Sequence, residues 1–73
     1  MTFQSHCSSL GIELLRDDIK FIKAQVLQIP QQLRKPTLQK YADIYLQGMA
    51  DCDNVIKKQN VGRMAANLYL LEK

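Results

Sequence analysis

Apolar side chains recur every three or four positions along most of this chain, which is the spacing of one face of an α-helix. The most regular series steps by 3, 4, 3, 4 and 3 residues, the heptad spacing by which helices pair. Its members are Ile12, Leu15, Ile19, Ile22, Val26 and Ile29. We call this series the heptad seam and expect it to contact another helix, of this chain or of a partner.

The heptad seam predicts a first long helix over about residues 9–28. Ser8 or Ser9 is suited to cap its start, because a hydroxyl accepts from the free N–H groups of a first turn. Pro30 disfavours helical geometry at the residue before it, so the helix should end near Gln28. Asp17 and Asp18, between the seam positions, should face water. Residues 1–8 should be flexible.

The segment after Pro30 predicts a second long helix. Pro30 and Pro36 both suit a first helical turn, where a missing N–H costs little. We therefore expect a short helical turn from residue 30 to 34 and a helix over residues 36–50; the alternative is one continuous, kinked helix from Pro30. The expected buried side consists of Leu38, Tyr41, Ile44, Tyr45 and Met49.

A third helix is predicted over residues 53–72, with Asp51 or Asp53 capping its start. Gly62 either allows another helix to approach closely or marks a bend. Within the helix, Ala65, Leu68 and Leu71 should pack and Arg63 should lie at the rim. The full apolar side consists of Val55, Ile56, Val61, Met64, Ala65, Leu68 and Leu71.

Asn67 and Tyr69 should also lie toward the rim of this helix. Asparagine is a mediocre helix former, so Asn67 in mid-helix suggests a specific hydrogen bond. Its partner is expected inside the fold, with a backbone group near Arg34 as one candidate; an external partner and a phosphate are the alternatives.

Short connections between these helices favour antiparallel neighbours. We expect an all-α fold, either a small three-helix bundle or an antiparallel helical hairpin with a third helix, forming a single domain over residues 1–73. A chain of 73 residues has a thin core, so a second copy or a protein partner is expected to add burial. The absence of a signal-peptide pattern and of a long apolar window predicts a cytoplasmic protein without membrane contact.

The chemistry-bearing residues are few. Cys7 and Cys52 form no CxxC pair and are expected to be free thiols. His6 is the one histidine, and with these cysteines it matches no standard zinc spacing. Asp17 and Asp18 are adjacent, so on a helix they point about 100° apart and form no catalytic pair. We expect a protein without enzymatic activity, cofactor or metal.

The formal net charge of +3 permits, without requiring, contact with nucleic acid. Phosphate contact needs accessible cations, and helix starts add N–H donors. The candidates are Arg34, Lys35, Lys40, Lys57, Lys58 and Arg63. Aspartates lie among these residues, so an ordinary mixed-charge surface is the alternative. Tyr41, Tyr45 and Tyr69 have the chemistry to stack on bases, but helical spacing favours core packing.

Two stretches resemble a known family. "IPQQLRKPTLQKYADIY" has the form [IL]-P-x-x-L-R followed by Y-x-x-I, and "VGRMAANLYLLEK" has the form R-x-x-A-N-x-x-L. Both resemble helical stretches beside the catalytic region of phage gene A type replication proteins, the rolling-circle initiator endonucleases. The matching residues are Pro30, Leu33, Arg34, Tyr41 and Ile44 in the first stretch, with Arg63, Ala66, Asn67 and Leu71 in the second.

That family uses a His-hydrophobe-His metal site and nucleophilic tyrosines. Tyr41 and Tyr45 stand four residues apart, as paired nucleophiles can, but this chain lacks the second histidine and the metal site. The resemblance therefore implies a helical accessory module of a mobile element without nicking activity.

Two hypotheses about function follow. The first is a small non-enzymatic helical binding module that acts in DNA replication or maintenance of a phage or plasmid-like element. The alternative is a protein–protein interaction module or regulatory helical dimer that binds no nucleic acid and uses the heptad seam.

Overall fold

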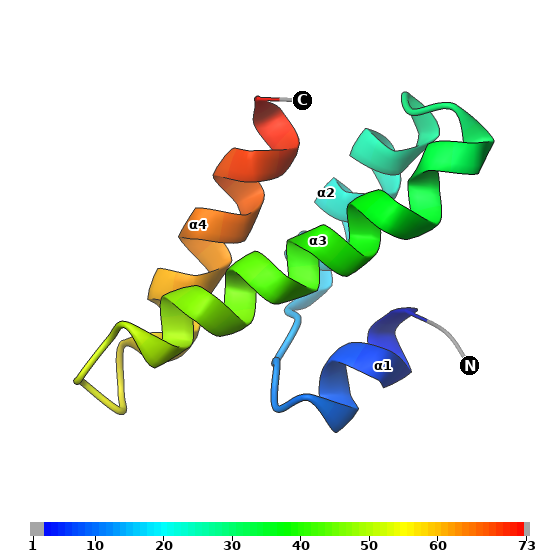
Figure 1. Ribbon diagram of the computed structural model, residues 1–73. Helices are drawn as coiled ribbons and strands as arrows, with labels where there is room; N and C mark the ends of the chain where they lie inside the picture. Colours follow the sequence, from blue (N-terminus) through cyan, green and yellow to red (C-terminus); the bar gives the residue numbers. More distant parts are fainter. Residues whose placement is uncertain (1–2, 73) are drawn as a thin grey trace.

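The computed structural model describes residues 3–72 and shows an all-α fold, as predicted (Figure 1). Within this range there are four helices and no strand: α1 (Phe3–Ser9), α2 (Arg16–Leu27), α3 (Gln31–Ala50) and α4 (Lys58–Leu71). α1 is additional to the three predicted helices. Residues 1–2 of the segment predicted to be flexible lie outside the described range.

The first predicted helix starts later than expected, because Gly11 ends α1 and the chain then runs extended. Gly11 has a φ of +82°, a conformation that residues with a Cβ rarely adopt. Its N–H donates to the Ser8 carbonyl at 3.1 Å, and the Ile12 N–H donates to the Cys7 carbonyl at 2.9 Å. Ser8 and Ser9 therefore do not cap α2. The cap contact comes from Asp18, which accepts from the Leu15 N–H at 3.1 Å.

α3 continues through Pro36 as one helix that begins after Pro30, so the expected short turn followed by a separate helix is wrong. The N–H that proline lacks would have paired with the carbonyl of Gln32, which is an exposed residue. The Arg34 side chain joins α3 to the end of α2: its Nε donates to the carbonyls of Val26 and Ile29, each at 3.1 Å.

The core gathers around α3, which crosses the centre of the molecule with α1 on one side and α4 on another (Figure 1). Tyr41 and Tyr45 are completely buried, and the other predicted core residues of α3 pack against the core while half-buried. The predicted buried side of this helix is thus confirmed. The buried hydrophobic residues are Cys7, Ile12, Ile22, Tyr41, Ala42, Tyr45, Ala66 and Leu70.

α3 and α4 form an antiparallel hairpin that crosses at two glycines. A Cβ at Gly62 would lie 2.6 Å from the Tyr45 carbonyl oxygen, and a Cβ at Gly48 would lie 2.9 Å from the Gly62 Cα. Both distances are shorter than side chains tolerate, so the two backbones touch here. Close approach of another helix, rather than a bend, explains Gly62.

Candidate interaction surface

Asp18, in the first turn of α2, and Arg63, in the second turn of α4, form an ion pair. The Arg63 Nε lies 2.6 Å from Asp18 Oδ2, and the side chains are only 16% and 8% exposed. The prediction that Asp18 faces water is therefore wrong. Arg63 is turned into the fold rather than toward the rim, and it also donates to the Glu13 carbonyl and to Asn60.

Two tyrosines of α3 add further buried hydrogen bonds beside the Asp18–Arg63 ion pair. We call these contacts together the polar layer. The Tyr41 hydroxyl donates to Asn67 Oδ1 at 2.7 Å, and the Tyr45 hydroxyl donates to Gln59 Oε1 at 2.9 Å. Burial raises the pKa of both tyrosines above its ordinary value, with the Asp18 carboxylate adding to the effect at Tyr41. Both hydroxyls therefore stay protonated and act as donors. The predicted bond of Asn67 lies inside the fold, and its partner is Tyr41.

Gln59 fixes the extended segment between α1 and α2 against the start of α4. Its Nε2 donates to the Gly11 carbonyl at 2.9 Å, and its Oε1 accepts from the Glu13 N–H at 3.1 Å. Every buried side-chain nitrogen or oxygen in the described residues has a hydrogen-bond partner. These hydrogen bonds, together with the close contact of Gly62 with α3, hold one side of α4 inward.

α4 consequently presents to solvent the side that the sequence predicted to pack. It buries Gly62, Ala66 and Leu70 against the core. On the opposite side, Val61 is 40% exposed, Met64 72%, Leu68 55% and Leu71 62%. We call these four residues the outer stripe. Their spacing of three, four and three residues is that of a helix-packing seam.

The predicted packing side of α4 is therefore wrong, and the reason is that this helix is apolar on two sides. The buried side carries Gly62, Ala66 and Leu70 beside polar residues with internal partners, whereas the four large apolar residues of the outer stripe are exposed. An apolar stripe along a surface helix normally packs against another apolar surface. Val55 and Ile56, in the turn before α4, are also strongly exposed.

The heptad seam is not one helix face. Ile12 lies in the extended segment before α2 and is buried, and Ile22 is also buried in the core. Ile19, Val26 and Ile29 are half-buried in the described structure. Leu15 is the one member of the seam that is exposed, at 56%. Half of the seam, Ile12, Ile22 and Val26, packs in or against the core of the chain itself.

The predicted nucleic-acid residues do not form one surface. Arg63 is occupied by Asp18, and the Nε of Arg34 by backbone carbonyls. Arg34 and Lys35 do lie together with His6, along a groove of about 780 Å³ between α1 and the start of α3. Lys40 is exposed on α3. Lys57 and Lys58 precede and begin α4, away from that groove.

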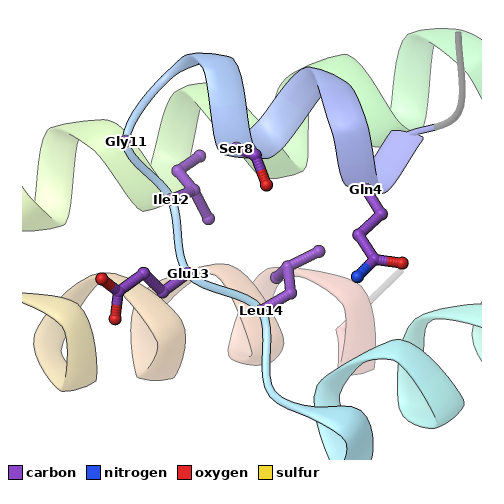
Figure 2. Close-up of a pocket in the computed structure, with 6 residues that line it drawn as sticks. All are labelled: Gln4, Ser8, Gly11, Ile12, Glu13 and Leu14. Atoms are coloured by element: carbon purple, nitrogen blue, oxygen red, sulfur yellow. The ribbon is translucent and has the colours of Figure 1, made fainter.

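A smaller pocket of about 370 Å³ lies between α1 and the extended segment (Figure 2). Gln4 and Ser8 of α1 border it, with Ile12, Glu13 and Leu14 below. The Glu13 side chain points away from Gln4 in this view. The lining thus offers one hydroxyl and one outward carboxylate, without the histidine or second carboxylate that acid–base catalysis commonly uses.

The cysteines are free thiols, as predicted. Burial raises the pKa of Cys7 to about 11, so this thiol is protonated and unreactive near neutral pH. Among residues 3–72, no three histidine, cysteine or carboxylate side chains gather in a position to hold a metal ion.

No protein-family model, curated protein or solved structure matches this chain. The resemblance to rolling-circle replication proteins therefore stays a prediction. Over the described residues, the helices are too short or too polar to cross a lipid bilayer.

Proposed function

We propose that this protein is a non-enzymatic helical binding module that acts through protein–protein contact, with the outer stripe of α4 as its contact surface. The observation that carries the proposal is the exposure of Val61, Met64, Leu68 and Leu71 on the side of α4 opposite the core. Half of the heptad seam, which was the predicted contact surface, packs inside the fold.

The exposed apolar area is large enough to support binding. The four side chains together expose the equivalent of more than two complete side chains. Complete burial of one such side chain contributes roughly 1.5–3 kcal/mol, so covering the stripe contributes on the order of 3–7 kcal/mol from this chain alone. A similar contribution from the partner brings the total into the range that offsets the cost of association.

The outer stripe also adds little to the stability of the isolated chain, because its side chains remain in water. A contiguous exposed apolar stripe of this kind is typical of an interaction surface. The nucleic-acid hypothesis has weaker support: two of its six candidate cations have internal partners, and the remaining lysines are dispersed.

Oxidative footprinting tests whether anything covers the stripe. Hydroxyl radicals would be applied to the dilute purified protein, to the concentrated purified protein, and to the protein in an extract of the cells that produce it. We expect Met64 and Leu68 to be protected in at least one of the last two conditions. Leu27, which is 72% exposed on α2, is the control and should stay reactive. Equal reactivity of the stripe in all three conditions would refute the proposal.

A Leu68→Glu variant tests whether the protection comes from contact at the outer stripe. Because Leu68 is exposed, the variant should fold with unchanged helicity. It should lose the protection of Met64, whereas a Leu27→Glu variant should keep it.

A further inference from the structure

We propose that the occupant of the outer stripe is a second copy of this chain, with the two α4 helices antiparallel. This inference rests on the proposed function and names the partner. A two-fold contact between identical copies uses the same patch on both, so the patch must be complementary to itself. The sequence of α4 satisfies that condition in one orientation.

The apolar register is the first argument. In an antiparallel pair centred between Met64 and Leu68, Met64 of one copy lies opposite Leu68 of the other. The same register sets Val61 opposite Leu71. Each apolar residue of the stripe therefore meets another, and none faces solvent or a charge.

The charges on one flank of the stripe are the second argument. Lys58, Ala65 and Glu72 are spaced by seven residues, so they follow the same edge of the stripe. Antiparallel pairing brings the Lys58 ammonium of each copy beside the Glu72 carboxylate of the other, at both ends of the interface. Ala65 lies at the centre of this edge, where its small side chain allows close approach.

Parallel pairing lacks this complementarity. The edge with Lys58 and Glu72 would then face the opposite edge, which carries Asn60 and Asn67, so neither charge would meet a counter-charge. The Asn67 amide is moreover engaged with Tyr41 in the described structure. The antiparallel arrangement is thus the one that pairs both the apolar and the charged positions.

Sedimentation of the purified protein over a range of concentrations tests whether the chain dimerises. We expect a reversible dimer that Leu68→Glu abolishes and the control Leu27→Glu leaves unchanged. A strict monomer whose stripe is nevertheless protected in cell extract would overturn this inference and leave the proposed function standing. A dimer that survives Leu68→Glu would also overturn it.

Charge reversal tests the register. Lys58→Glu and Glu72→Lys should each weaken the dimer by about tenfold, because each creates like-charge contacts at both ends of the interface. The double variant should restore dimerisation to nearly the original affinity. Failure of the double variant to recover would refute the ionic register.

Disulfide trapping tests the orientation directly. In a Cys52→Ser background, one chain would carry Met64→Cys and another Leu68→Cys. Disulfides form only where the two Cα atoms lie within about 7 Å. The antiparallel pair predicts the mixed 64–68 crosslink, whereas crosslinks between identical positions would show a parallel pair. The native Cys7 is buried and should not interfere.

Discussion

The contact between α3 and α4 makes a specific prediction for Gly62→Ala, in which two effects oppose each other. In an exposed helix, the change from glycine to alanine stabilises by about 1 kcal/mol. Here the new methyl group would lie 2.6 Å from the Tyr45 carbonyl oxygen and 2.7 Å from Tyr45 Cδ1. A carbonyl within a helix cannot move aside alone, so the two helices must separate.

Overpacking of this kind costs about 1–3 kcal/mol, and separated helices lose contact along the whole hairpin. We therefore expect Gly62→Ala to lower the free energy of unfolding by about 1–3 kcal/mol, despite the better helix propensity. For a domain of this size, 1 kcal/mol corresponds to a shift in Tm of about 4–8 °C. The clash should outweigh the helix propensity, so the change in the free energy of unfolding should be a loss.

Urea unfolding followed by circular dichroism measures this effect, at a protein concentration that keeps the chain monomeric. Ala65→Gly on another side of α4 is the control, and it should lose only the propensity difference of about 1 kcal/mol. Gly48→Ala should also destabilise, and the double variant should lose less than the sum of the two, because the first change already separates the helices. A Gly62→Ala protein with equal or higher stability would refute the close contact.

Three further predictions concern the polar layer, the buried titratable groups and the cations. Arg63→Met leaves the Asp18 carboxylate buried without its partner and should lower the free energy of unfolding in urea by about 3–5 kcal/mol. Asp18→Leu with Arg63→Met should recover this loss except for about 1 kcal/mol, because it also removes the Asp18 contact that caps α2. A near-neutral single variant would contradict the ion pair. Burial raises the pKa of Cys7 from 9.0 to about 11, so the folded state holds the thiol proton more tightly than the unfolded chain does. The stability that this difference contributes is complete below pH 9 and is lost as the pH rises toward 11. Thermal melts should therefore show Tm falling across that range, and falling less in Cys7→Ala. Titration of labelled duplex and single-stranded DNA at two salt concentrations should show no tight binding near physiological salt; tight, salt-dependent binding would instead favour the nucleic-acid hypothesis.

The pattern of apolar residues was sufficient to predict the all-α fold and the inward side of α3. Tyr41 and Tyr45 recur with helical spacing among other apolar residues, and Leu38 and Met49 of the same series pack against the core beside them. The internal bond of Asn67 was also predictable, because a poor helix former in mid-helix usually has a specific partner. The close approach at Gly62 was one of two stated alternatives.

The orientation of α4 was not predictable from spacing, because both of its sides are apolar. The choice depends on Arg63 and Asn67, whose partners Asp18 and Tyr41 lie far away in the sequence. The spacing of residues within one helix does not show which distant residues will pair with them. The end of α1 did leave a local signal, since Gly11 follows two serines and a leucine at the position where helices often terminate in a left-handed glycine.

The hairpin of α3 and α4 has a consequence for how the chain acquires its structure. These two helices are consecutive, are joined by a short loop and share the most extensive contact between any two helices of the described chain. Little loop entropy is lost in bringing them together, so we expect them to form the folding nucleus, with α1 and α2 docking afterwards. Amide protons near the two glycines should accordingly exchange last with deuterated water, and those of α1 first.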